Sequence, residues 1–225
     1  MSLLLEVAIR SERDVMGAQE GGADRLLLAD ANGRSPDLTA ASVALREADI
    51  PVRIVLRLND SFTTTGGEFT RLVGLAQEYV ALGAEGVAFG FLDADLDIDE
   101  ATCRALAESL EGVPWTFHDA VDSGLDTRRV WRSLLQLPGL DGVLTSGSPQ
   151  GLGVGYDDLL ATAQADERAA ALMLPGQGLL PEHVPWLARA GVTKFHIGIQ
   201  ARPGASYKSY VDSGHVRSWR LLLDS

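Results

Sequence analysis

Short apolar runs alternate with longer amphipathic stretches along the whole chain. Each run has the length and composition of a buried strand, and each stretch has the apolar spacing of a helix that packs on one face. Glycine ends several of the amphipathic stretches just before the next apolar run, as at Gly22, Gly83, Gly139 and Gly191. Glycine at this place suits a left-handed helix end. The predicted strands lie near 3–9, 24–29, 52–58, 86–90, 114–118, 141–145, 170–174 and 193–198, and the predicted helices near 12–20, 39–48, 68–82, 99–110, 126–136, 155–165, 181–190 and 212–223.

Eight alternating strand and helix pairs predict an α/β fold with a parallel sheet. The composition does not change along the chain in a way that marks a second domain, so residues 1–225 are predicted to form one (βα)8 TIM barrel. An open, doubly wound sheet is the alternative, but no Gly-x-Gly-x-x-Gly motif follows the first predicted strand.

Polar residues within the predicted strands point to a site inside the barrel. Side chains alternate between the two faces of a strand, and the outer face must be apolar to pack on helices. This parity places Glu6, Arg57, His118 and His196 in the lumen, at or near the ends of the strands where barrel enzymes keep their active sites. We expect Glu6 to pair with Arg57 or with a ligand. The four are candidate catalytic residues, and a buried ion pair with two structural histidines is the alternative.

Loops at the same end of the barrel carry candidate anion-binding groups. Thr145 and Ser146 follow the sixth predicted strand, Gly176 and Gly178 follow the seventh, and Gly198 follows the eighth. Glycine-rich loops after the last strands of such barrels often bind phosphate through backbone N–H groups. These five residues are therefore the predicted ligand or anion site.

Charge and cysteine content narrow the partners. The net charge of −12 argues against nucleic acid and against anionic membranes, which need a basic surface. Cys103 is the single cysteine, so no internal disulfide forms. No basic region followed by a long apolar stretch opens the chain, so neither a signal peptide nor a membrane span is expected. The expected partner is a small molecule or a metal ion in the cytoplasm, and the sequence leaves a homo-oligomer open.

Several motifs, taken in order, resemble the copper homeostasis protein CutC family over roughly residues 3–200. No single motif is diagnostic, but the combined order and spacing are specific. The resemblance implies a TIM barrel, a cytoplasmic location and a part in copper homeostasis with copper binding. The motifs are Leu5-Glu6-Val7, Ala18-Gln19-Glu20-Gly21-Gly22-Ala23-Asp24-Arg25, Gly86-Val87-Ala88-Phe89-Gly90, Thr116-Phe117-His118, Leu144-Thr145-Ser146-Gly147, Pro175-Gly176-Gln177-Gly178 and Lys194-Phe195-His196.

The chain departs from that family at residues that matter for copper. Ala8 stands where the family usually has a cysteine after Leu-Glu-Val. The family often has a second cysteine after the second strand, and here Ala29 and Asp30 stand at that place instead. Copper(I) prefers thiolate and thioether ligands, so direct copper binding is doubtful here.

Three functions therefore remain. A metal site would use His118, His196 and Glu6, a set that suits copper or another divalent ion such as zinc or iron. An enzyme, whether isomerase, lyase or hydrolase, would use the same residues for proton transfer on a small anionic substrate. A barrel that binds a ligand without catalysis is the third possibility.

Overall fold

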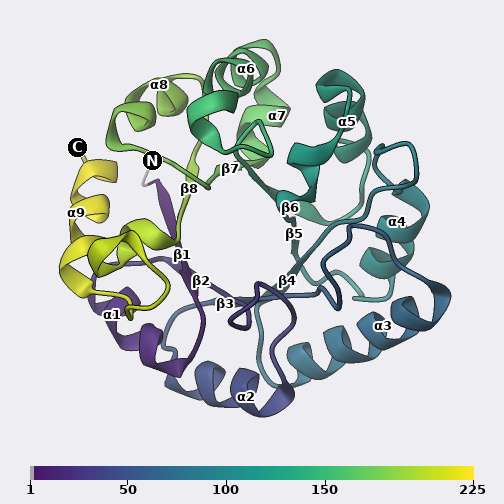
Figure 1. Ribbon diagram of the computed structural model, residues 1–225, viewed down its shortest axis with the longest axis horizontal. Coiled ribbons are helices and arrows are strands. Elements are labelled where there is room, and N and C mark those ends of the chain that lie inside the picture. Colours follow the sequence, from purple (N-terminus) through teal and green to yellow (C-terminus); the bar gives the residue numbers. More distant parts are fainter. Residues whose placement is uncertain (1–2) are drawn as a thin grey trace.

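A computed structural model describes residues 3–225 of this protein. Eight parallel strands follow one another around a barrel in the order β7-β6-β5-β4-β3-β2-β1-β8 (Figure 1). A ladder between β1 and β8 joins the beginning of the chain to its end, and β7 and β8 are neighbours without a ladder within the described residues. The predicted TIM barrel is confirmed. The strands are β1 (Leu4–Ile9), β2 (Arg25–Leu28), β3 (Val52–Val55), β4 (Gly86–Phe89), β5 (Trp115–Phe117), β6 (Leu140–Thr145), β7 (Met173–Pro175) and β8 (Lys194–Ile197).

Helices surround the strands on the outside of the barrel (Figure 1). They lie close to the predicted ranges, with one addition before β7. The helices are α1 (Val15–Glu20), α2 (Leu38–Glu47), α3 (Gly66–Ala81), α4 (Glu100–Glu108), α5 (Thr127–Leu134), α6 (Leu152–Ala165), α7 (Glu167–Leu172), α8 (Val184–Arg189) and α9 (Ser213–Leu223).

Helix α7 corrects the predicted strand at 170–174. Asp166 caps this helix by accepting hydrogen bonds from the backbone N–H groups of Arg168 and Ala169. A run of alanine then favours continued helix, because alanine has the highest helix propensity. The strand β7 consequently starts only at Met173.

The helix–glycine–strand repeat has the expected backbone conformation. Gly22, Gly83, Gly139 and Gly191 have φ values of 95°, 105°, 69° and 98°. Residues with a Cβ rarely adopt this left-handed region, so glycine allows the chain to turn from each helix toward the next strand.

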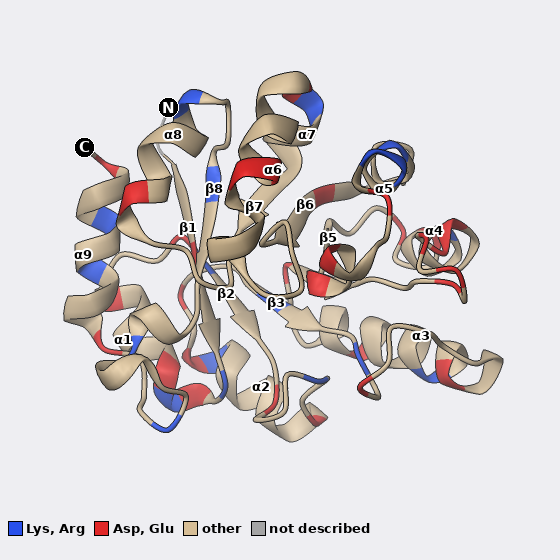
Figure 2. Ribbon diagram, turned by 45° about the horizontal axis from the view of Figure 1, so that its top comes forward, with Lys and Arg blue, Asp and Glu red and all other residues tan. Residues whose placement is uncertain are grey.

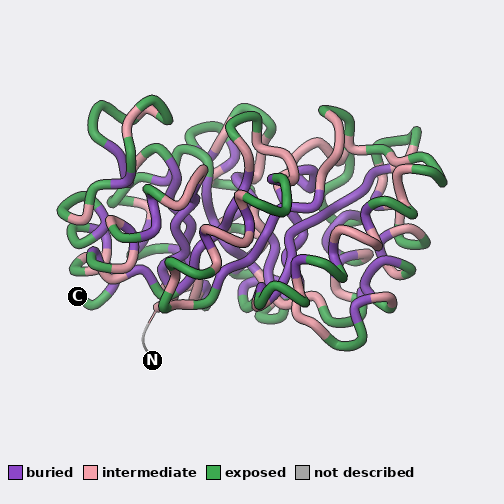
Figure 3. The backbone as a smooth tube through the Cα atoms, turned by 90° about the horizontal axis from the view of Figure 1, so that it is seen from below, coloured by how far each residue is buried: buried purple, intermediate pink, exposed green. Residues whose placement is uncertain are grey.

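The main hydrophobic core lies between the strands and the helices. The outward-facing side chains of β1, such as Leu5 and Val7, are fully buried in it, and the Trp115 ring stacks on Phe89 with 4.0 Å between ring centroids. The strands form the buried centre of the molecule in Figure 3. A second, small apolar cluster, which includes Leu27 and Val55, fills part of the lumen.

Ion pairs form the floor of the lumen. Arg53 of β3 is fully buried and binds both Glu85 and Asp141, with N–O distances of 2.8 Å and 2.5 Å. Lys194 donates a hydrogen bond to the carbonyl of Asp141 at the same end. Most other charged residues lie on helices and loops rather than on strands (Figure 2).

The segment between β8 and α9 folds back over the start of the chain. Its anchor is Arg202, whose Nη1 and Nη2 donate to the Asp14 carboxylate at 3.0 Å and 2.8 Å. Both side chains are only 1% exposed. The anchor holds residues 203–212 beside the C-terminal end of β1. No helix within residues 3–225 has the length and apolar character needed to cross a bilayer.

Candidate active site

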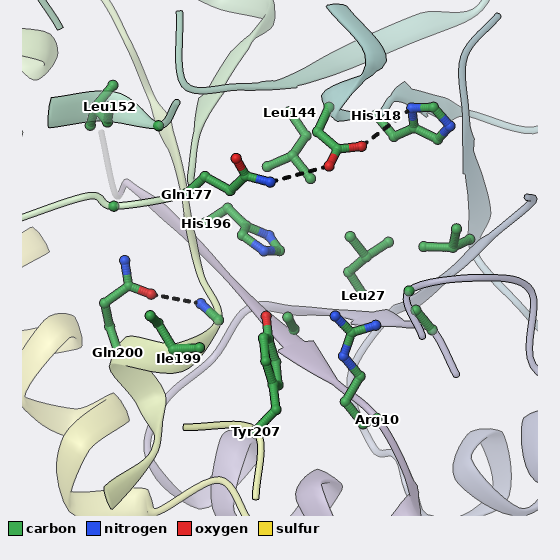
Figure 4. Close-up of a pocket in the computed structure, with 18 of the residues that line it drawn as sticks. Arg10, Leu27, His118, Leu144, Leu152, Gln177, His196, Ile199, Gln200 and Tyr207 are labelled. Carbon is green, nitrogen blue, oxygen red and sulfur yellow. Dashed lines mark hydrogen bonds and ion pairs between the residues drawn. The ribbon is translucent and has the colours of Figure 1, made fainter. Parts of the chain in front are cut away.

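A cavity of about 580 Å³ opens at the C-terminal ends of the strands. His196 of β8 lies near its centre, with Leu27 and Leu144 forming apolar wall and Arg10 and Tyr207 on one side (Figure 4). A cavity of this size accommodates a small organic molecule. It lies at the end of the barrel where the sequence predicts the candidate site, because the candidate residues stand at or near the C-terminal ends of their strands.

Glu6 and Arg25 form a buried pair directly behind His196. The β ladders place Glu6 between Arg25 on β2 and His196 on β8. Glu6 is fully buried, its Oε2 accepts from Arg25 Nε at 2.6 Å, and its Oε1 lies 2.8 Å from His196 Nδ1. Burial by itself raises the pKa of Glu6, but the charge of Arg25 and the hydrogen bond with His196 outweigh it and lower the pKa to about 2.

The charge of Glu6 fixes which nitrogen of a neutral His196 ring carries the proton. A carboxylate can only accept hydrogen bonds, so the proton of a neutral His196 ring lies on Nδ1. The lone pair is then on Nε2, on the other side of the ring. His196 is therefore held as an oriented proton acceptor, as in other sites where a carboxylate fixes a histidine tautomer.

The expected pairing of Glu6 with Arg57 is wrong. Arg57 follows β3 and lines the cavity, but its Nε and Nη2 donate to the backbone carbonyls of Asn59 and Asp60 at 2.9 Å and 2.7 Å. Its guanidinium also lies 4.7 Å from the centre of the Phe62 ring. Glu6 pairs with Arg25 instead because both lie deeper in the lumen and are adjacent in register.

His118 lines the same cavity but has a local structural contact. Its Nδ1 accepts a hydrogen bond from the backbone N–H of Ala120 at 3.2 Å and so caps the short helix that follows β5. Burial lowers the pKa of His118; Asp119, 3.6 Å away, opposes this effect and Arg57 adds to it. His118 is thus neutral at pH 7, with Nδ1 already engaged. The catalytic part predicted for it remains a prediction.

The predicted anion-binding groups of Thr145 and Ser146 bind a carboxylate of the protein, that of Asp122. The hydroxyls of both residues donate to the Asp122 carboxylate, at 2.5 Å and 2.7 Å, and the backbone N–H groups of Ser146 and Gly147 add bonds of 2.7 Å and 3.0 Å. Burial raises the pKa of Asp122, although these hydrogen bonds oppose the rise. The loop has anion-binding geometry, and Asp122 occupies it.

The three predicted glycines differ in what they do. Gly178 and Gly198 line the cavity. The N–H of Gly176 donates to the Thr145 carbonyl at 3.0 Å, and that of Gly198 donates to Gln200 Oε1 at 3.0 Å. A Cβ at Gly176 would lie 2.8 Å from Leu144 Cδ1, which is too close, and 3.3 Å from His196 Cδ2. Gly176 and Gly198 therefore shape the site, while their N–H groups are engaged within the protein.

Three residues of the site were missed by the sequence reasoning. Arg10 lies on the same side of β1 as Glu6, one residue beyond the end of the strand, and Arg25 lies on the same side of β2 as Leu27. The alternation of side chains along these two strands therefore places both arginines in the lumen. Tyr207 lies in the segment after β8, outside any strand. No sequence signal pointed to Tyr207.

The donor atoms present do not suit copper(I). Across residues 3–225, no three His, Cys, Asp or Glu side chains are placed to hold a metal ion, so the set of His118, His196 and Glu6 is not assembled as a metal site. The described cavity lining contains neither cysteine nor methionine. Burial raises the pKa of the Cys103 thiol, which is fully buried in α4, to about 12. A thiol in that setting is a core residue rather than a metal ligand.

Fold and cavity together define a single-domain (βα)8 barrel protein with a cavity at the C-terminal ends of its strands. The CutC family model matches residues 3–201, and the chain belongs to the CutC family. The family protein CutC of Xanthomonas campestris is 32% identical over 198 residues, which cover 85% of this chain and 81% of the relative. The human copper homeostasis protein cutC homolog is 28% identical over 91% of this chain and 76% of its own length.

A solved structure supports the same fold. The CutC protein of Streptococcus agalactiae superposes with a TM-score of 0.76 at 21% identity, covering 87% of this chain and 98% of that one. The matched region of the family model ends before Arg202 and Tyr207. The family assignment therefore covers the barrel and its Glu6–His196 pair, while the anchored C-terminal segment lies beyond it.

Proposed function

We propose that this CutC-family barrel acts on a small organic molecule by proton transfer at His196. The observation that carries the proposal is the hydrogen bond of 2.8 Å between His196 Nδ1 and a fully buried Glu6, directly at a cavity of about 580 Å³. A buried, ionised carboxylate behind a histidine is costly in a fold that only needs a packed lumen. The orientation of His196 as a base gives this buried carboxylate a function.

The chemistry follows from the hydrogen bonds. His196 Nε2 accepts a proton from the bound molecule, or from a water that attacks it, and the ring becomes an imidazolium. Glu6 stays ionised because Arg25 holds its other oxygen, so its charge stabilises that imidazolium. Return of the proton to another atom of the molecule gives isomerisation, its delivery to a leaving group gives elimination, and activation of water gives hydrolysis.

The name of the human relative links it to copper homeostasis. We propose that any part this chain takes in that process passes through the small molecule, not through a metal held by its own side chains. The reason is the donor set around the cavity, which contains imidazole, guanidinium and amide groups in place of thiolates. The cytoplasmic location that the resemblance implies belongs to the same proposal.

The test of proton transfer compares two histidines that each contact a carboxylate. A panel of small hydroxy acids, keto acids and sugar phosphates is incubated with the protein in D₂O, and C–H exchange and product formation are followed by ¹H NMR. His196→Asn retains an amide donor for Glu6 but has no proton acceptor, and we expect the rate on any active compound to fall by about 10²–10⁴-fold.

The matched control is His215→Asn. His215 Nδ1 lies 2.9 Å from Asp212 Oδ1, but this pair is half-exposed on α9, so its loss should leave the rate unchanged. A compound turned over equally by the wild type and His196→Asn contradicts the proposal. Binding without exchange or turnover for every compound favours the non-catalytic barrel.

Copper binding gives a separate prediction. Titration of the reduced protein with copper(I) against a chromophoric chelator should show no 1:1 complex, because no thiolate or thioether of residues 3–225 lines the cavity. Cys103→Ser should give the same curve as the wild type. A stoichiometric complex that disappears in His196→Asn would instead establish a metal site at the barrel mouth.

A further inference from the structure

The cavity is cationic although the protein is acidic. The chain carries a net charge of −12, yet the charged residues described along the cavity are Arg10, Arg57 and Asp119. Asp119 faces other groups of the wall, with its Oδ2 accepting from Gln177 Nε2 at 3.2 Å and its Oδ1 3.6 Å from His118. An acidic surface that surrounds a basic cavity favours an anionic ligand in that cavity.

Of the two arginines described along the cavity, Arg10 has fewer of its donors engaged than Arg57. Its Nη1 donates to the Asp30 carbonyl at 2.8 Å, and its Nε is buried without a hydrogen-bond partner among residues 3–225. Arg25 and Arg202, by contrast, are buried against the carboxylates of Glu6 and Asp14. Within the described residues Arg10 forms no such ion pair, so its charge is not neutralised by the protein. A guanidinium in this state is suited to a planar, bidentate anion.

Tyr207 holds the Arg10 guanidinium in place from the C-terminal segment. The guanidinium carbon lies 4.5 Å from the centre of the Tyr207 ring, a cation–π distance. The Tyr207 hydroxyl reaches over Gly198, where a Cβ would collide with it. Figure 4 shows this hydroxyl and the Arg10 guanidinium facing the same open space as the His196 ring.

We infer that the ligand carries a carboxylate or phosphate group and that Arg10 and Tyr207 bind this group beside His196. The inference rests on the proposed function in that it takes the same cavity as the ligand site. Arg10 supplies charge-assisted hydrogen bonds and Tyr207 an O–H donor, which fix the molecule with its reacting atom near Nε2 of His196. Arg57, which the sequence analysis named as a candidate catalytic residue, has two of its donors committed to backbone carbonyls.

The test uses two simple anions, inorganic phosphate and malonate, titrated into ¹⁵N-labelled protein. The backbone amides of Gly33 and Gly198, which line the cavity next to Arg10 and Tyr207, report binding. We expect saturable shifts with at least one anion, weakened by about tenfold or more in Arg10→Met because one charge-assisted contact is lost. Tyr207→Phe, which removes only the hydroxyl, should weaken binding by about threefold.

The matched control is Arg13→Met. Arg13 also lies over a tyrosine, with 5.5 Å to the centre of the Tyr210 ring, but both residues are exposed outside the cavity. Its replacement should leave the affinity unchanged. The relative affinity of phosphate and malonate tells which of the two anion types the site prefers.

Three results overturn the inference. The first is no saturable binding of either anion up to about 50 mM, far above the ~1 mM range of weak specific ligands. The second is equal binding by Arg10→Met and the wild type. The third is loss of binding in Arg57→Met alone. If Arg10→Met unfolds, the affinity of Tyr207→Phe for the anions is the deciding measurement, and an affinity equal to that of the wild type overturns the inference. The readout here is binding, so the two proposals can fail separately. Anion binding at Arg10 without proton transfer at His196 refutes only the proposed function. Proton transfer at His196 without anion binding at Arg10 refutes only this inference.

Discussion

Glu6→Gln is expected to lower the free energy of unfolding by about 3–5 kcal/mol, because it leaves the buried Arg25 guanidinium without its counter-charge. Arg25 is only 5% exposed and Glu6 is fully buried, so water cannot replace the lost partner. Urea unfolding followed by tryptophan fluorescence measures the change. Glu85→Gln is the matched control. Glu85 also binds a buried arginine, but its side chain is 35% exposed and Arg53 keeps Asp141, so the change should be much smaller.

The same pair predicts a dependence on pH. The pKa of Glu6 falls from an ordinary 4.5 to about 2 in the folded protein. A lowered carboxyl pKa stabilises the fold above the unfolded value, and this contribution is lost as pH falls from 4.5 toward 2. At about 1.4 kcal/mol for each pH unit between the two values, roughly 3 kcal/mol is at stake. The difference between wild type and Glu6→Gln should therefore shrink below pH 4.5. A difference that stays constant with pH, or one below about 1 kcal/mol, contradicts the buried ion pair.

Arg202→Ala is expected to cost about 3–5 kcal/mol of stability and to loosen the segment after β8. The substitution leaves the Asp14 carboxylate buried with only backbone donors, among them the N–H groups of Arg10 and Val211 at 2.8 Å and 2.9 Å. Tryptic cleavage after the exposed Lys208 measures the loosening and should become faster. Anion binding should weaken in parallel, since Tyr207 belongs to the released segment.

Arg217→Ala is the control for this variant. Arg217 is exposed on α9 and donates one hydrogen bond to the carbonyl of Glu20. Its loss should change stability little, because exposed contacts contribute little. Unchanged cleavage at Lys208 in Arg202→Ala would show that the segment is held by other contacts.

The fold could be predicted from sequence because each of its signals is local. Alternation of apolar runs and amphipathic stretches gave the eight units, and the glycines between them gave the helix ends. The exception, α7, arose because periodicity cannot tell a short apolar run in a strand from one in a helix, and here the alanines and the Asp166 cap favour the helix. Strand parity likewise identified the lumen side of Glu6 and His196.

Partners within the site were harder to predict because they depend on height along the barrel axis. Parity says which face a residue occupies, but not which of several lumen residues it meets. Glu6 pairs with Arg25 rather than Arg57 because the stagger of neighbouring strands sets them level. Asp122 fills the predicted anion loop because a helical turn after β5 brings it there. Tyr207 comes from an irregular segment, for which periodicity gives no information.

The buried Glu6–Arg25 pair lies on different parts of the fold from most groups that line the cavity. The pair beside His196 lies on the neighbouring strands β1 and β2 and is buried. The groups that line the cavity come from the ends of strands, from the loops that follow them and from the C-terminal segment. Under the proposed function, changes in those outer parts would alter ligand selectivity while leaving the contact between Glu6 and His196 in place. Such a scaffold is well suited to acquiring new substrates during evolution or by laboratory redesign.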